Sequence, residues 1–140
     1  MIWLLDLRLN TYWYQVGNGD FMHAFFSTIC YHLEEKHWGS KYPHLMNELY
    51  QGRLKKNNLG KAIAELKDIK ERLKEFLPAE VIWDIDDLDA KPPWGDNISA
   101  EIKDLSTYFV TNDGEDLVSV LGNALAKADV LNEDLYIDSL

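Results

Sequence analysis

Every second residue from Trp3 to Leu9 is tryptophan or leucine, and the positions between them are largely polar. This two-residue period is typical of a β-strand with one buried face. Tyr12 to Val16 continues the β-prone composition, so the pattern predicts either a second strand after a tight turn at Asn10-Thr11 or one long bent strand. Gly17-Asn18-Gly19 ends this region, and Asp20 is placed to cap a helix.

Five later segments repeat apolar residues at spacings of three and four, the period of an amphipathic helix. The third segment is the most regular, because its other faces are charged and Pro78 stops it. The first is apolar over much of its circumference and is expected to pack at the centre of the protein. The predicted helices are Phe21 to about Lys36, His44 to Gln51, Leu59 to Phe76, Ser99 to Phe109 and Glu115 to Ala128.

A different pattern separates the third and fourth of these helices. Val81–Asp86 is rich in β-branched and aromatic residues and predicts a strand, while Pro92-Pro93-Trp94-Gly95 predicts a loop after it. Beyond Asn132 the tail is expected to fray or to form a short edge strand. Residues 1–140 are therefore predicted to form a single α+β domain, with a small, mainly antiparallel sheet packed against about five helices.

Composition favours a folded intracellular protein. Hydrophobic residues fill 46% of the 140 positions, which is enough for a packed core despite a formal net charge of −10. The single cysteine, Cys30, excludes a disulfide framework and favours a reducing cytosol. The N-terminus does not resemble a signal peptide, and no apolar run reaches the roughly 20 residues of a membrane-spanning helix, so a cytoplasmic location is expected.

The negative charge is concentrated in the second half of the chain. Residues 78–140 contain 15 of the 24 acidic residues and only three of the 14 basic ones. An acidic surface repels nucleic acid and anionic membranes and attracts basic proteins, so a basic protein is the expected partner. The aromatic residues Trp3 and Trp13 offer one alternative, an adaptor protein that associates with itself. The sequence leaves the oligomeric state open.

Four aspartates within six positions, from Asp84 to Asp89, raise the question of a metal or catalytic site. An EF-hand loop beginning at Asp84 would need an oxygen ligand at position 5, glycine at position 6 and glutamate at position 12. Leu88, Asp89 and Gly95 stand there instead. The four histidines are too dispersed for a zinc motif. No cofactor and no catalytic residue is therefore predicted, although a small metal-dependent hydrolase using Asp84 and Asp86 stays as an alternative.

The same acids fit a surface that binds a basic protein. Asp86, Asp87, Asp89 and Asp96 supply acceptors for lysine and arginine. Trp94 is either a rigid anchor for a partner or a lid over the core. We predict that these five residues form a partner-binding surface.

A series of short motifs runs from about residue 20 to residue 126. They are Phe25-Phe26-Ser27-Thr28-Ile29, Trp38-Gly39-Ser40 with Pro43 and Asn47-Glu48-Leu49, Val81-Ile82-Trp83-Asp84, Pro93-Trp94-Gly95, and Tyr108-Phe109 with Asp113-Gly114. In their order and spacing these motifs resemble the immunity protein 70 family of bacterial polymorphic toxin systems. The N-terminal segment, from Trp3 to Val16, carries none of them.

The resemblance implies a small cytoplasmic α+β protein that binds a cognate toxin and neutralises it, without catalysis and without a cofactor. It does not assign the residues that contact the toxin, because contact residues differ among immunity proteins even on one fold. Many such toxins are nucleases with a basic substrate-binding cleft. The acidic surface of this chain is complementary in charge to a cleft of that kind.

Overall fold

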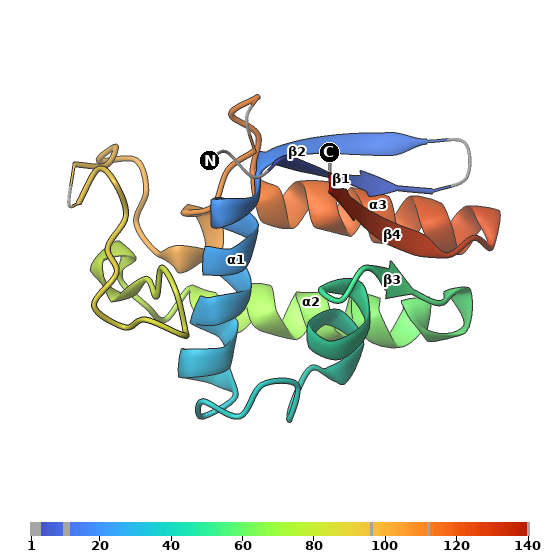
Figure 1. Cartoon of the computed structure of the whole chain (residues 1–140), viewed down its shortest axis with the longest axis horizontal. Helices are drawn as coiled ribbons and strands as arrows, with labels where there is room; N and C mark the ends of the chain where they lie inside the picture. Colours follow the sequence, from blue (N-terminus) through green and yellow to red (C-terminus); the bar gives the residue numbers. More distant parts are fainter. Residues whose placement is uncertain (1–3, 10–11, 96, 112, 140) are drawn as a thin grey trace.

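A four-stranded antiparallel sheet joins the two ends of the chain (Figure 1). The computed structural model describes residues 4–9, 12–95, 97–111 and 113–139. The order of the strands is β2-β1-β4-β3, and each neighbouring pair is antiparallel, as the sequence predicted. The strands are β1 (Leu4–Arg8), β2 (Trp13–Asn18), β3 (Arg53–Leu54) and β4 (Leu135–Ser139).

The N-terminal region forms a hairpin of two strands, so Tyr12–Val16 does not continue one long bent strand. The N–H of Leu9 donates to the carbonyl of Tyr12 over 2.7 Å and closes the turn. Leu7 and Leu9, which share a face of the extended chain, are completely buried, as the two-residue period predicted. Trp3 lies outside the described residues.

The C-terminal tail forms a strand, but the prediction of an edge strand is wrong. β4 pairs with β1 on one side and with β3 on the other, so it lies inside the sheet. Leu135 is buried, and the guanidinium of Arg53 donates to the carboxylate of Asp134 over 2.7 Å and 3.0 Å. Both neighbours of β4 are far earlier in the chain, which is why the local pattern did not reveal its position.

The helices form a second layer on the sheet. α2 (Leu59–Leu73) and α3 (Leu117–Leu131) lie side by side and antiparallel, α3 also contacts the strands, and α1 (Gly19–Thr28) crosses near their ends (Figure 1). α1 continues into a π-helical turn, η1 (Ile29–Leu33). None of the helices in the described ranges is both long and apolar enough to cross a bilayer. The remaining turns are η2 (His44–Leu49), η3 (Lys56–Asn58), η4 (Pro78–Glu80) and η5 (Leu105–Thr107).

The two long helices follow their apolar periods closely. α3 begins after Asp116, whose carboxylate accepts the N–H of Ser119 over 3.3 Å, and it ends at Asn132, which adopts the left-handed conformation with φ of 56°. The buried face of α2 repeats every three or four residues, as predicted. It consists of Leu59, Ala62, Leu66, Ile69 and Leu73.

The prediction of a strand at Val81–Asp86 is wrong. The backbone of this segment bonds to hydroxyl groups of α1 and not to a neighbouring strand. The N–H of Ile82 donates to Oγ1 of Thr28, and the N–H of Ile85 donates to Oγ of Ser27, each over 3.1 Å. The apolar side chains of the segment pack against the core while the chain stays irregular. Burial alone therefore accounts for a composition that is typical of strands.

The prediction of a helix over Ser99–Phe109 is also wrong. The helical structure in this segment is limited to the short turn η5. The carboxylate of Asp104 accepts the N–H of Ser106 over 2.8 Å and also its hydroxyl hydrogen. Such local bonds compete with the backbone bonds of a helix. The N–H of Leu105 donates to the carbonyl of Phe76 over 3.1 Å, which fixes the segment to the chain just beyond α2.

Candidate functional site

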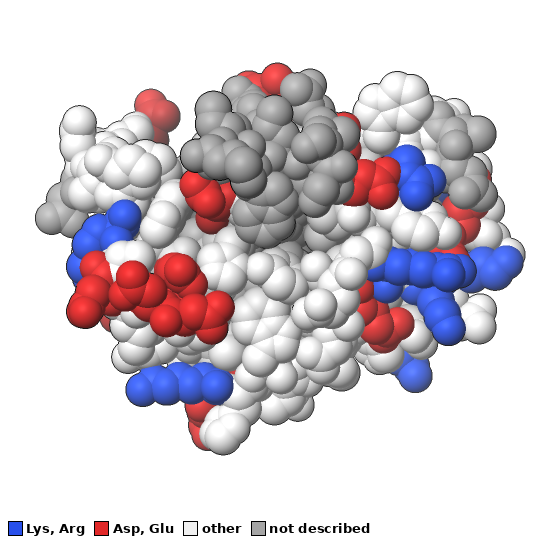
Figure 2. Space-filling model, in the orientation of Figure 1, with Lys and Arg blue, Asp and Glu red and all other residues white. Residues whose placement is uncertain are grey.

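Residues 84–89, termed the acidic loop, lie at one end of the molecule. Asp86, Asp87 and Asp89 are exposed, and no lysine, arginine or histidine within the described ranges forms an ion pair with any of them. Figure 2 shows a patch of acidic side chains at the left, over the yellow loop of Figure 1. The fourth predicted acid, Asp96, lies outside the described residues. Three of the predicted carboxylates thus face solvent, and no cationic side chain in the described part of the chain pairs with them.

Two buried hydroxyl groups of α1 hold the start of this loop. Ser27 and Thr28 are completely buried. Oγ1 of Thr28 accepts the N–H of Ile82 and donates to the carbonyl of the same residue over 3.3 Å, while Oγ of Ser27 accepts the N–H of Ile85. These two buried hydroxyls therefore fix the backbone of residues 82–85 against α1.

A chain of hydrogen bonds fixes the first acid of the loop. His23, on α1, has its Nδ1 2.5 Å from Oη of Tyr50 and its Nε2 3.0 Å from Oδ1 of Asp84. The same Oδ1 accepts the N–H of Asp86 over 2.9 Å. The hydrogen bond from His23 lowers the pKa of Asp84, whereas burial, followed by the charges of Asp86 and Asp84, raises the pKa of Tyr50. Asp84 therefore stays ionised and anchors the loop.

Replacing Asp84 with asparagine is expected to reduce the loss of stability in acid. Because the folded-state pKa is lowered, the ionised carboxylate stabilises the fold above the unfolded pKa of about 3.9, and this stabilisation is lost as the pH falls through the folded pKa. The side chain is 35% exposed, so the difference is below about 1 kcal/mol. Urea unfolding at a series of pH values should show a shallower decline for Asp84→Asn below about pH 4. A parallel decline in both proteins would contradict the ionic role.

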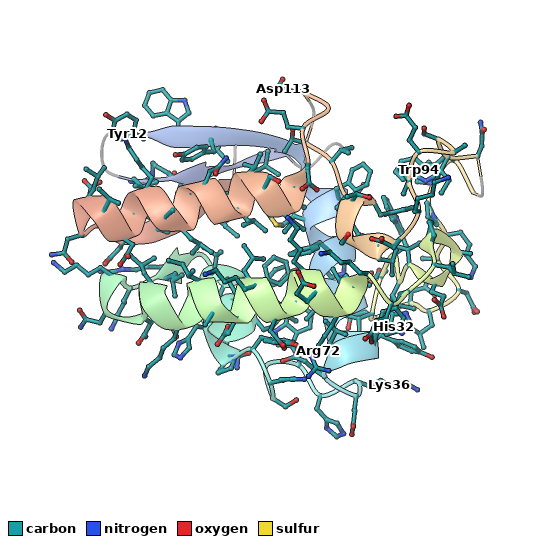
Figure 3. The ribbon with its side chains drawn as sticks, turned by 180° about the vertical axis from the view of Figure 1, so that it is seen from behind. Tyr12, His32, Lys36, Arg72, Trp94 and Asp113 are labelled. Atoms are coloured by element: carbon teal, nitrogen blue, oxygen red, sulfur yellow. The ribbon has the colours of Figure 1, made fainter. Side chains whose placement is uncertain are left out.

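Trp94 closes the aromatic end of the core beside the acidic loop. Its ring stacks on Phe21 with centroids 5.1 Å apart and meets Trp83 edge-on at 5.4 Å. The indole N–H donates to Oη of Tyr108 over 3.0 Å. Figure 3 places Trp94 at the opposite end of the molecule from Tyr12. These contacts agree with one of the two roles expected for Trp94, that of a lid over the core. Its contact with a partner stays a prediction.

An apolar groove of about 720 Å³ lies near the same end of the molecule. Leu77, which lines it, is 65% exposed. A hydrophobic surface close to a charged rim is the usual anatomy of a protein-binding site. The other residues along the groove are Pro78, Ala79, Val81, Lys91, Pro92, Gly95, Ile98 and Tyr108.

A buried carboxylate that the sequence did not reveal shapes the loop after η1. Glu34 is 3% exposed, and its side chain accepts the backbone N–H groups of Gly39, Lys41 and Tyr42 over 2.9 to 3.1 Å. Gly39 has φ of 78°, and an added Cβ there would lie 2.1 Å from the side chain of Asn47. The loop therefore requires both the acid and the glycine.

The structure also places the residues of the two alternative functions, a metal-dependent hydrolase and a self-associating adaptor. Asp84 and Asp86, proposed for a metal-dependent hydrolase, offer ligand atoms within 4.8 Å of each other and of His23. Trp13, proposed for self-association, is 69% exposed on β2, which forms an edge of the sheet. Self-association stays a prediction.

The sequence motifs that resemble the immunity protein 70 family contact one another in the folded protein. Ser27 and Thr28 bind the backbone of the motif that begins at Val81. In the motif that begins at Trp38, the indole N–H donates to the carbonyl of Met46 over 2.9 Å, beside the motif Asn47-Glu48-Leu49. Trp94 likewise donates to Tyr108. These motifs thus build the framework that carries the acidic loop, and they do not include its exposed aspartates.

A comparison with protein families agrees with this resemblance. The family model described as Immunity protein 70 matches residues 7–137 of the 140-residue chain. Searches of the curated proteins and of the solved structures found no significant match. Because the match covers nearly the whole sequence, from the end of β1 to the middle of β4, the chain belongs to the immunity protein 70 family.

Proposed function

We propose that this protein binds a cognate toxin of a bacterial polymorphic toxin system and neutralises it without catalysis. The proposal rests on one observation above all. Asp86, Asp87 and Asp89 are exposed on a loop that is anchored to α1, and no cation within the described residues pairs with them. A protein of an immunity family that displays unpaired acids in this way is suited to bind a basic surface.

The charge of the loop indicates which part of a toxin it contacts. A nuclease binds phosphate groups in a cleft lined by lysine and arginine. Carboxylates that enter such a cleft form charge-assisted hydrogen bonds with the same side chains and exclude the nucleic acid. Attraction between the two surfaces also speeds their encounter, at a rate that falls as salt is added. A cytoplasmic nuclease toxin is therefore the partner that fits this surface best.

The anchoring of the loop supports tight binding. A flexible acidic segment would lose conformational freedom when it bound, and that loss would weaken the complex. Here the hydroxyls of Ser27 and Thr28 and the imidazole of His23 hold the start of the loop before any partner arrives. The nearby groove beside Leu77 adds apolar area that a toxin side chain can fill.

Co-expression in a bacterial host with the protein encoded by the gene immediately upstream tests this function. Cells that express the upstream protein alone should stop growing, and cells that express both proteins should grow normally. The two proteins should purify together at equal stoichiometry and lose association as the salt concentration rises. If the upstream protein neither harms the cells nor binds this chain, the proposal fails for that partner pair.

A further inference from the structure

A histidine and two aspartates from distant parts of the chain come together at the base of the acidic loop. His23 lies within α1, whereas Asp84 and Asp86 belong to the loop. Each residue offers one ligand atom, and these three atoms lie within 4.8 Å of one another. We propose that His23, Asp84 and Asp86 form a binding site for a divalent transition-metal ion of the zinc class. This site goes beyond the proposed neutralisation of a toxin.

The set of ligand atoms selects the class of cation. One imidazole nitrogen and two carboxylate oxygens match the ligands of zinc, which binds nitrogen and oxygen at about 2.0 to 2.2 Å. Magnesium and calcium prefer ligand sets made entirely of oxygen. Three protein ligands also leave a fourth position of a tetrahedral ion open to water. Zinc is therefore the appropriate probe, with magnesium and calcium as the comparison ions.

Tyr50 orients the histidine for this role. Its ring packs against Phe26 at 4.8 Å and against Trp38 at 5.0 Å, so the phenol is held in place beside Nδ1 of His23. A histidine that ligates a metal usually donates its other N–H to such a partner. An ion bound through Nε2 would replace the hydrogen bond from Nε2 to Asp84. The neutral ring would then carry its proton on Nδ1, and Oη of Tyr50 would accept that N–H. Nε2 and the two carboxylates would then share the ion as ligands.

The local charge also favours a cation. Asp84 pairs with His23, but within the described part of the chain Asp86 has no cationic partner. The carboxylate of Asp86 is therefore a negative charge that no basic side chain among these residues balances. A bound dication would compensate this charge. Because Asp86 is exposed, its carboxylate has room to close the gap to an ion bound by the other two ligands.

Calorimetric titration of the purified protein with zinc chloride at neutral pH tests the site. We expect one ion per chain, and an affinity for magnesium and calcium at least about 100-fold weaker. His23→Asn should abolish detectable binding, and Tyr50→Phe, which removes only the partner of the ligand, should weaken it about tenfold. Retention of binding in His23→Asn, or no binding in the wild-type protein, would overturn the proposal.

Two matched controls separate this site from incidental binding by other histidines. His37 is exposed outside the cluster, and His44 is hydrogen-bonded to Glu48, so these two side chains could themselves attract zinc. His37→Asn and His44→Asn should leave the affinity within about twofold of the wild type. A loss in His44→Asn equal to that in His23→Asn would place the ion elsewhere and would overturn the proposal.

Substitution of the exposed ligand Asp86 tests the site without destabilising the fold. Asp86→Asn is expected to weaken zinc binding at least about tenfold while the unfolding temperature of the metal-free protein stays unchanged. Zinc should raise the unfolding temperature of the wild type and not that of this variant. Equal stabilisation of both proteins by zinc would refute the site. Because these experiments need no toxin, their failure leaves the proposed neutralising function untouched.

Discussion

Replacing Glu34 with alanine is expected to lower the free energy of unfolding by about 3 to 5 kcal/mol. The carboxylate is almost completely buried and accepts three backbone N–H groups of the loop from Gly39 to Tyr42. An alanine leaves those donors without an acceptor, and each unsatisfied buried donor costs about 1 to 3 kcal/mol. Chemical denaturation followed by tryptophan fluorescence measures the change, because Trp38 lies in the affected segment.

The neighbouring residue supplies a matched control for this variant. Glu35 carries the same charge but is exposed, so Glu35→Gln should change the free energy of unfolding by less than about 0.5 kcal/mol. Glu34→Gln keeps the shape of the side chain and one acceptor oxygen, and it should lie between the wild type and Glu34→Ala. A value for Glu34→Ala within about 0.5 kcal/mol of the wild type would mean that the loop does not depend on this carboxylate.

Elements with a strong local period could be predicted from the sequence. The helix predicted from Leu59 to Phe76 is observed over Leu59–Leu73, because one face is apolar and the others are charged. The first strand follows from the alternation of apolar residues, although this pattern left open whether a second strand or one long bent strand came after it. In these cases the side chains that decide the structure are neighbours along the chain.

Elements that depend on distant partners could not be predicted in the same way. Val81–Asp86 has the composition of a strand, but two hydroxyls of α1 take up its backbone N–H groups, and these lie more than 50 residues earlier in the chain. β4 is central only because β1 and β3 lie on either side of it. The composition of a segment indicates that it is buried, but it does not indicate which groups form hydrogen bonds with its backbone.

The candidate site likewise has a part that could be predicted from the sequence and a part that could not. The exposure of Asp86, Asp87 and Asp89 agrees with the solvated surface expected from four acids in six positions. The role of His23 could not be predicted, because it lies 61 residues from Asp84 and matches no motif for metal ligands. A search for ligand spacing along the chain detects only sites whose ligands are close in sequence.

Reversing the charge of the acidic loop is expected to weaken toxin binding at least about 100-fold, or about 3 kcal/mol. In the triple variant Asp86→Lys, Asp87→Lys, Asp89→Lys, attraction to a basic surface becomes repulsion, so the association rate should fall and dissociation should quicken. The three side chains are exposed and form no ion pair within the described residues, so the fold should be retained. Circular dichroism and the unfolding temperature check this point.

A second triple variant controls for the change in net charge. Asp113, Glu115 and Asp129 are also exposed acids but lie outside the acidic loop, and their replacement by lysine alters the net charge equally. Chelator in both experiments keeps any metal ion from contributing. The most direct measurement is surface plasmon resonance of the two variants on the immobilised cognate toxin. Our account predicts a large loss of affinity for the acidic-loop variant alone, and equal affinities for the two variants would contradict it.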